Sequence, residues 1–488
     1  MIRHTKIVAT LGPASSSPQA LERLLRAGVD VVRLNFSHGK AEEHITLADT
    51  VRQVATRLKR PVGILADLQG PKIRIGKFEN GKILLKEGDS FILDAQCTLG
   101  NQARVGLDYK DLLHDVNRGS ILLLDDGRLV LEVSHVAGAQ IHTRVRHGGE
   151  LSNNKGINRQ GGGLSAPALT AKDMDDIKTA AQMGADFLAV SFPKSASDMY
   201  MARQLMRAAG GGALTIAKIE RVEAVDALAE ILDASDGLMV ARGDLAVEVG
   251  DAAVPALQKR MIRMARERNK LAITATQMME SMIHAPTPTR AEVSDVANAV
   301  IDGTDAVMLS AETAVGTYPE QTVEAMARIC RAAEKSMPIT LDREFLDRVF
   351  TRIDQSIALS ALFAAYHLNV KAIVALTSSG STALWMSRLD CGVPIFALTQ
   401  EAASLPKMSL FRQVTPLLID PMPDDRAGMR REIERRLIEA DVAAEGDLIV
   451  LTYGDRHGTP GGTNTLSIMR IGEGAQTAAP NMHIPPFH

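Results

Sequence analysis

The chain has 488 residues, of which 45% are hydrophobic and 23% charged, the composition of a folded protein of about three domains. A formal net charge of −3 argues against a nucleic-acid-binding surface. The three cysteines form no CxxC pair, which indicates a reducing compartment, and we expect the cytoplasm. The apolar run after Lys6 is interrupted at Gly12, too early for a secretory signal, and the sequence predicts no membrane-spanning segment.

Short β-rich runs alternate with amphipathic helical patterns along most of the chain. Eight runs occur, over residues 6–10, 29–35, 62–67, 186–192, 214–220, 237–244, 271–277 and 306–312. Helical patterns between them include residues 18–27, 42–58, 172–183, 222–232 and 290–301. Strand–helix alternation predicts a parallel sheet, and eight units close most naturally into a (β/α)8 TIM barrel. A large, open, doubly wound sheet is the alternative.

Two segments depart from this alternation. Residues 71–167 contain short strands separated by Gly- and Asp-rich turns, which predict hairpins. We expect an all-β domain, a small β-barrel inserted at the carboxyl face of the main barrel, where it can act as a lid. The α/β pattern restarts with helices at 355–367 and 382–389 and strands at 371–377, 394–399, 447–452 and 465–470.

The predicted domains are therefore a catalytic barrel, an inserted lid and a C-terminal α/β domain. Their residues are 1–70 with 168–345, 71–167, and 346–488. The Ala- and Pro-rich residues after about Gly474 are expected to be disordered.

Polar residues cluster at the ends of the predicted barrel strands, the face at which such barrels hold their active sites. The two-residue period of a strand puts Lys218 and Glu220 on one face, and Arg242 and Asp244 on another. Other strands contribute Arg33, Asn35, Ser37, Asp67, Thr276, Ser310 and Glu312. Because buried charges must be paired or bind a metal, these residues predict one polar site.

The residue types at this site suit a metal-dependent reaction of an anionic substrate. Glu220 and Asp244 offer the hard oxygen ligands that Mg²⁺ prefers, and Lys218 and Arg33 add positive charge. Phosphoryl transfer fits this set, and so does the metal-enolate chemistry of an aldolase or lyase. The sequence contains no Walker A motif, no GxSxG elbow and no HExxH motif.

At these residues the sequence resembles the pyruvate kinases. The matching segments are residues 6–16, 33–39, 217–220, 239–245, 275–278 and 288–299, and the resemblance extends from about residue 5 to 472. It implies a (β/α)8 barrel, an inserted β lid and a C-terminal α/β domain. It also implies phosphate transfer from phosphoenolpyruvate to ADP, the last step of glycolysis, by a homotetramer.

The resemblance assigns roles to individual residues. Glu220 and Asp244 are similar to the family's Mg²⁺ ligands, and Lys218 and Arg33 to its contacts with the transferred phosphoryl group. Gly243, Asp244 and Thr276 match the substrate-carboxylate site, and Thr276 and Ser310 match the proton route to the enolate. His38, Arg74 and Lys155 fall where the family contacts nucleotide phosphates.

Two departures from the family pattern bear on function. Members that require K⁺ carry Thr and Glu where this chain has Leu68 and Lys72, although Asn35, Ser37 and Asp67 of the monovalent-cation region remain. A tethered ammonium can replace K⁺ and repel it, so we expect an enzyme that does not require K⁺. Val315 stands where relatives often have Lys, which removes one possible phosphate contact.

A second phosphate-binding site is expected in the C-terminal domain. Six residues follow a predicted strand and open a helix: Thr377, Ser378, Ser379, Gly380, Ser381 and Thr382. By resemblance this loop, with the neighbouring residues 458–464, binds a phosphorylated allosteric activator, for which both a sugar phosphate and AMP are suitable. A catalytically silent regulator that binds phosphometabolites here is the remaining alternative.

Overall fold

The computed structural model describes residues 2–337, 350–389, 391–421, 425–454 and 461–473. Residues 5–336 form one compact unit, and residues 337–488 form another together with the first four residues. The predicted domain boundary at residues 345 and 346 and the tail after about Gly474 lie outside the described residues. Within those ranges, no helix is long and apolar enough to cross a membrane.

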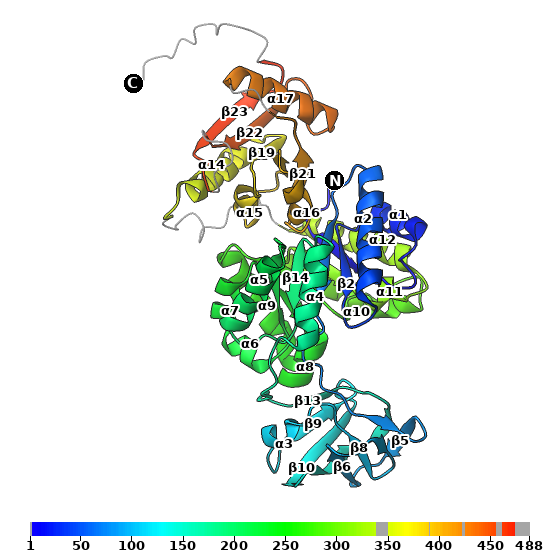
Figure 1. Cartoon of the computed structure of the whole chain (residues 1–488). Coiled ribbons are helices and arrows are strands. Elements are labelled where there is room, and N and C mark those ends of the chain that lie inside the picture. The colour runs from blue at the N-terminus through cyan, green and yellow to red at the C-terminus, as the bar shows by residue number, and fades with distance from the viewer. Residues whose placement is uncertain (1, 338–349, 390, 422–424, 455–460, 474–488) are drawn as a thin grey trace. The chain divides into compact units, whose positions relative to one another are not determined.

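The first unit is built around a closed barrel of eight parallel strands (Figure 1). These are β1 (Lys6–Thr10), β2 (Val31–Asn35), β3 (Gly63–Asp67), β14 (Phe187–Val190), β15 (Leu214–Ile219), β16 (Gly237–Ala241), β17 (Leu271–Ala275) and β18 (Ala306–Leu309). Each strand pairs in parallel with two neighbours, in the order β1-β18-β17-β16-β15-β14-β3-β2. The predicted TIM barrel is confirmed, and the open-sheet alternative is wrong.

Helices surround the barrel, and the first of them shows how local sequence signals bound such a helix. In α1 (Pro18–Ala27), the Ser17 hydroxyl accepts a hydrogen bond from the amide of Ala20, and Gly28 ends the helix at a φ of 128°. The other large helices are α2 (Ala41–Arg57), α4 (Ala171–Gln182), α5 (Ala196–Ala208), α9 (Val254–Glu267), α10 (Arg290–Ile301) and α12 (Pro319–Ser336). The helix predicted at 222–232 is two helices, α6 (Val222–Asp226) and α7 (Leu228–Ala234).

Two barrel strands end earlier than the sequence pattern indicated. The run at 237–244 leaves the sheet after Ala241, and Arg242 begins helix α8 (Arg242–Val249). The run at 306–312 leaves it after Leu309, and helix α11 (Ala311–Ala314) follows. Asp244 and Glu312 therefore lie in the first turns of helices, where an acidic side chain complements the helix dipole.

The inserted segment is an additional sheet domain within the same unit. A six-stranded sheet contains β13 (Ile157–Arg159), β9 (Ile121–Leu124), β10 (Leu129–Ala137), β11 (Gln140–His147), β6 (Ser90–Asp94) and β8 (Arg104–Gly106), in this order. Two short pairs, β12 (Gly149–Ser152) with β5 (Lys82–Leu85) and β4 (Lys77–Phe78) with β7 (Leu99–Gly100), complete it. It has its own hydrophobic core, which includes Phe91, Leu122 and Ile141.

The second unit is an α/β domain with a five-stranded sheet. The order is β21 (Val414–Leu418), β20 (Ile395–Thr399), β19 (Ala372–Leu376), β22 (Leu448–Tyr453) and β23 (Thr465–Arg470), with β23 antiparallel to its neighbour. Helices α14 (Ile353–Leu368), α15 (Ser381–Ser387) and α17 (Arg426–Glu439) belong to it. The sequence pattern missed β21, which contains Pro416, and the highly charged α17.

Candidate active site

Lys218 lies at the centre of a buried charge cluster at the carboxyl ends of β3 and β15. Its Nζ lies 3.1 Å from Asp67 Oδ1 and 3.0 Å from Glu220 Oε1, and it donates a 2.7 Å hydrogen bond to Ser191 Oγ. Burial alone would lower the pKa of Lys218, but the charges of Asp67 and Glu220 outweigh it and hold that pKa above its ordinary value. Lys218 is therefore a fixed positive charge at neutral pH.

Asp67 links this lysine to the second cation of the site. Its Oδ2 accepts a 2.6 Å hydrogen bond from Nε of Arg33, whose Nη1 donates to Thr10 Oγ1 at 3.0 Å. Burial would raise the pKa of Asp67, but Lys218 and Arg33 outweigh that effect and lower it. The carboxylate stays ionised and holds two positive side chains, each 12% exposed, toward the mouth of the barrel.

Glu220, just beyond β15, is oriented by a turn at the end of β14. Its Oε2 accepts a 2.8 Å hydrogen bond from the amide of Phe192, and burial raises its pKa to about 7. The Ser191 hydroxyl in the same turn donates to the carbonyl of Leu68 at 2.7 Å. The strand period correctly put Lys218 and Glu220 on one face, because their charged groups are in contact.

Gly243, Asp244 and Thr276 meet where α8 begins beside the end of β17. The amide of Gly243 donates to Thr276 Oγ1 at 2.8 Å. Thr276 and Gln277 both have positive φ angles, 66° and 54°, which strain the backbone of this turn. Arg242 stabilises this turn. Its Nη2 donates a hydrogen bond to the carbonyl of Thr276, and its Nη1 pairs with Asp295 Oδ1, both at 2.7 Å.

Ser310 begins the turn after β18, next to Glu312. The buried Glu312 carboxylate accepts hydrogen bonds from the amide of Ser310 at 2.7 Å and from the amide of Met279 at 3.2 Å. It thereby ties the turn after β18 to the loop that follows Thr276. The two hydroxyls named for proton transfer, Thr276 and Ser310, thus follow adjacent strands joined by one carboxylate.

Two cavities open near these groups. A cleft of ≈ 610 Å³ between the inserted domain and α8 is lined by Lys72, Asp126, Asp244 and Gln277 among others. A second cavity, of ≈ 880 Å³, is lined by the residues after β1 and β2 and by α2, and includes Pro13, Asn35, His38 and Val315. These volumes are those of small-molecule sites.

Comparison with known proteins identifies this arrangement. The family model for the pyruvate kinase barrel domain matches residues 2–323, and that for the pyruvate kinase alpha/beta domain matches residues 355–469. The chain belongs to the pyruvate kinase family. It is 52% identical to pyruvate kinase II of Salmonella typhimurium over 476 residues, which cover 96% of this chain and 99% of that protein. The enzyme is accordingly a phosphotransferase.

Other relatives agree over the same extent. A pyruvate kinase of Haemophilus influenzae is 52% identical over 464 residues, covering 94% of this chain and 97% of that protein. A pyruvate kinase of Corynebacterium efficiens is 42% identical over 473 residues, which cover 97% of this chain and 99% of that protein. The similarity therefore includes the barrel, the inserted domain and the C-terminal domain.

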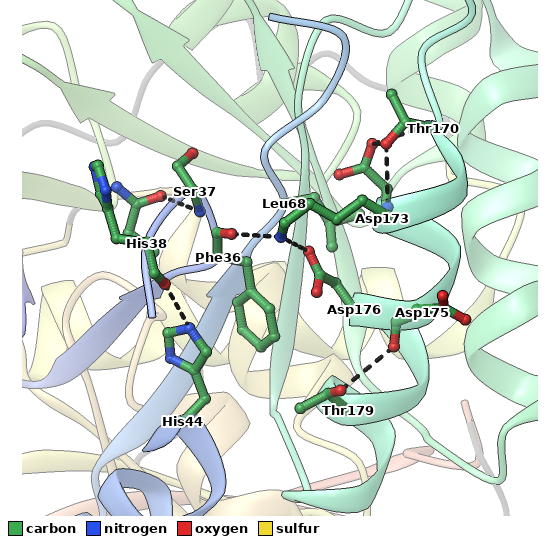
Figure 2. Close-up of polar contacts among 12 residues, drawn as sticks. Phe36, Ser37, His38, His44, Leu68, Thr170, Asp173, Asp175, Asp176 and Thr179 are labelled. Atoms are coloured by element: carbon green, nitrogen blue, oxygen red, sulfur yellow. Dashed lines mark hydrogen bonds and ion pairs between the residues drawn. The ribbon is translucent and has the colours of Figure 1, made fainter. Parts of the chain in front are cut away.

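The region predicted to bind a monovalent cation lies at the ends of β2 and β3. Asn35 Oδ1 accepts a 3.1 Å hydrogen bond from the amide of Ser37, and Leu68 lies beside this turn (Figure 2). Lys72 lines the 610 Å³ cleft with Asp244, and it makes no ion pair with any residue that the structure describes. The structure therefore brings Lys72 to the mouth of the site but not into contact with Asn35, Ser37 or Asp67.

Of the three predicted nucleotide contacts, His38 belongs to the barrel, whereas Arg74 and Lys155 lie on neighbouring segments of the inserted domain. His38 lines the 880 Å³ cavity, and its carbonyl bonds to Nε2 of His44 at 2.9 Å (Figure 2). Burial lowers the pKa of His44, so this ring is neutral and donates from Nε2. Arg74 and Lys155 belong to the inserted domain, where Arg74 Nη1 donates to the carbonyl of Asn154 at 3.1 Å and Lys155 pairs with Asp125 at 2.7 Å.

The candidate effector loop follows β19 in the second unit. Thr377 Oγ1 accepts a 2.9 Å hydrogen bond from the amide of Gly380, which has a φ of 86°. Thr382 Oγ1 lies 2.7 Å from Thr463 Oγ1, so the loop meets the segment before β23. Of the neighbouring loop at 458–464, only residues 461–464 lie within the described residues.

Sequence reasoning missed several residues that shape the site. Ser191 and Phe192 hold Lys218 and Glu220, and Arg221 packs on the Phe192 ring. The rule that polar residues at strand ends face the active site would have found Ser191 after β14. Phe192 acts through its backbone amide, which no side-chain pattern reveals.

Proposed function

We propose that this pyruvate kinase transfers the phosphoryl group of phosphoenolpyruvate to ADP, giving ATP and pyruvate in the last step of glycolysis in the cytoplasm. The observation that supports this most directly is the Lys218 ammonium held between two buried carboxylates, within electrostatic reach of Arg33 and Asp244. A site with fixed cations and several carboxylates suits a phosphate-bearing anion together with a divalent cation.

Positive charge is the main contribution of the chain to phosphoryl transfer. Lys218, with its raised pKa, stays protonated throughout and stabilises the negative charge on the phosphoryl group in flight and on the enolate. Arg33 supports the same phosphoryl group from β2. Asp67 orients both cations by contacts of 2.6 and 3.1 Å, so that little reorganisation is required during the reaction.

The turns at the start of α8 and the end of β17 are suited to bind the carboxylate group of the substrate. The amides of Gly243 and Asp244, at the N-terminus of an eight-residue helix, and the Thr276 hydroxyl would bind the carboxylate. Thr276 and Ser310, with water, would deliver the proton that converts the enolate to pyruvate. Glu312 keeps the turns that bear these hydroxyls in register.

Glu220 and Asp244 would hold Mg²⁺. Asp244 makes no side-chain hydrogen bond or ion pair with the described residues, and no cluster of three His, Cys, Asp or Glu occurs among them. Two carboxylates fit Mg²⁺, which retains positions for substrate oxygens and water. The ion would neutralise charge on the phosphoryl oxygens.

The alternatives make different predictions about nucleotide. An aldolase or lyase that uses a metal enolate would act without ADP, and a silent regulator would bind phosphometabolites without turnover. We expect pyruvate to form from phosphoenolpyruvate only when ADP and Mg²⁺ are both present. His38, Arg74 and Lys155 would contact the nucleotide phosphates, the last two once the inserted domain closes over the cleft.

We expect full activity without K⁺, because the Lys72 ammonium supplies a positive charge at the mouth of the site. The assay is pyruvate formation in K⁺-free buffer, with K⁺ or tetramethylammonium added at equal ionic strength. Lys72→Glu should lower the rate in K⁺-free buffer and make it respond to K⁺. Lys77→Glu is the matched control, since Lys77 is exposed on β4 and does not line the cleft.

A strict K⁺ requirement of the wild type would contradict this role of Lys72. So would a Lys72→Glu variant that remains fully active and indifferent to K⁺.

The loop Thr377–Thr382 would bind a phosphorylated activator, through its hydroxyls and the amides at the start of α15. We expect a sugar phosphate or AMP to lower the half-saturating concentration of phosphoenolpyruvate several-fold. Ser379→Asp should abolish that shift without changing the rate at saturating substrate, because Ser379 is exposed and a carboxylate there repels phosphate. Activation that persists in this variant would place the effector elsewhere.

A homotetramer is the proposed assembly. Helix α14 carries apolar side chains that the described chain leaves exposed, with Ile353 68%, Phe363 50% and Leu368 45% exposed. Such a face favours contact with a second copy. Light scattering should give four times the mass of one chain.

A further inference from the structure

Arg221 is a buried cation that the reaction described above does not use. It follows Glu220 directly and is 3% exposed, yet its Nε and Nη1 are buried with no hydrogen-bond partner among the described residues. A guanidinium is costly to bury unless its charge and donors are compensated. Its environment should therefore contain a partner.

One compensating contact is the ring of Phe192. The Cζ atom of Arg221 lies 5.2 Å from the ring centroid, within the range of a cation–π interaction. Phe192 has a φ of 54°, which is unusual for an aromatic residue, and its amide donates the 2.8 Å hydrogen bond to Glu220 Oε2. The guanidinium thus packs on the strained residue that orients the Glu220 carboxylate.

Gly70 also packs closely against this turn. A Cβ atom at Gly70 would lie 2.7 Å from Cβ of Ser191 and 3.0 Å from Cδ2 of Phe192. The turn is therefore in close contact with both Gly70 and Arg221, and removal of the guanidinium removes its packing on the Phe192 ring.

The second compensating feature is a small cavity of ≈ 20 Å³. Arg221, Lys72, Asp244, Glu248 and Asn158 are among its lining residues. A cavity of this volume has room for about one water molecule, which needs two to four polar partners. The two unpartnered nitrogens of Arg221 supply donors, and Asp244 and Glu248 supply acceptors.

We propose that Arg221 is a positioning residue for the divalent-cation site. It fixes the Phe192 turn that orients Glu220, and through a water in the small cavity it restrains Asp244. This inference rests on the proposed role of Glu220 and Asp244 as metal ligands. Residues one step removed from a metal usually change its affinity by about 10–100-fold when replaced.

Mn²⁺ binding provides the test, because it can be measured without turnover from the electron paramagnetic resonance signal of the free ion. Arg221→Met, which keeps the length of the side chain but removes its charge and donors, should raise the Kd for Mn²⁺ about 10–100-fold. Arg221→Lys keeps a cation over the ring and should recover part of the affinity. In turnover, the Mg²⁺ concentration for half-activation should rise in Arg221→Met, with kcat at saturating Mg²⁺ changed much less.

Arg203→Met is the matched control. Arg203 is also a barrel arginine, but its Nη2 pairs with Asp236 at 3.0 Å and donates to Thr215 Oγ1 at 2.8 Å, at the amino end of β15. Its loss should leave the Kd for Mn²⁺ unchanged. If Arg221→Met does not fold, Arg221→Gln, which retains donors but no charge, replaces it and should also weaken binding.

Wild-type affinity in folded Arg221→Met or Arg221→Gln would overturn the inference, as would equal weakening in Arg203→Met. A wild type that binds no Mn²⁺ would overturn it as well. A wild type that binds Mn²⁺ but transfers no phosphate to ADP would instead contradict the proposed function, and the Arg221 comparison would still decide the positioning role.

Discussion

Lys218→Met lowers kcat by at least about 10²–10³-fold while the protein remains folded. The ammonium pairs with both Asp67 and Glu220, and its raised pKa keeps it charged at every pH at which the enzyme works. Methionine has a similar length and no charge, so the loss reports the electrostatic contribution. The measurement is kcat at saturating phosphoenolpyruvate, ADP and Mg²⁺, with circular dichroism to verify the fold.

Lys259→Met provides the comparison for this variant. Lys259 lies on α9 and pairs with Asp302, away from the residues of the site. We expect its kcat to match the wild type. A near-normal kcat of Lys218→Met would contradict the catalytic role proposed for Lys218.

Asp67→Asn has the second large effect, because it acts on both cations at once. The buried carboxylate pairs with Arg33 at 2.6 Å and with Lys218 at 3.1 Å, and an amide cannot neutralise either. Breaking a buried ion pair in this way costs about 3–5 kcal/mol. We therefore expect a lower Tm and, since the two cations then repel each other, a fall in kcat of about 10²-fold or more.

Asp186→Asn is the control that separates the loss of stability from the loss of kcat. Asp186 precedes β14 at the amino end of the barrel and pairs with Arg52 at 2.7 Å. Its replacement should lower Tm but leave kcat unchanged. If Asp67→Asn only lowers Tm, as Asp186→Asn does, then Asp67 stabilises the barrel without orienting the catalytic charges.

The barrel was predictable because its strands are short apolar runs that end in polar residues. The same rule correctly joined Lys218 and Glu220, which are two residues apart at the end of β15. It was wrong for Arg242 and Asp244, because the chain turns into α8 after Ala241. Where a strand stops depends on the neighbouring turns, which periodicity does not encode.

Other parts of the site depend on contacts between distant segments. The Phe192 amide reaches Glu220 across 28 positions in the sequence, and Asp67 Oδ2 reaches Arg33 across 34. Asp67 was assigned to the monovalent-cation region, whereas its contacts also make it the anion between Arg33 and Lys218. Pairings of this kind follow from the closure of the barrel and not from local pattern.

The most direct test of the central claim is to follow the phosphorus atom of phosphoenolpyruvate by ³¹P NMR, with ADP and Mg²⁺ in K⁺-free buffer. We predict that its signal is replaced by that of the γ-phosphate of ATP, in equal amount to the pyruvate formed. Release of inorganic phosphate instead would contradict phosphoryl transfer to ADP. So would an unchanged signal with folded protein after a sugar phosphate and AMP have been added.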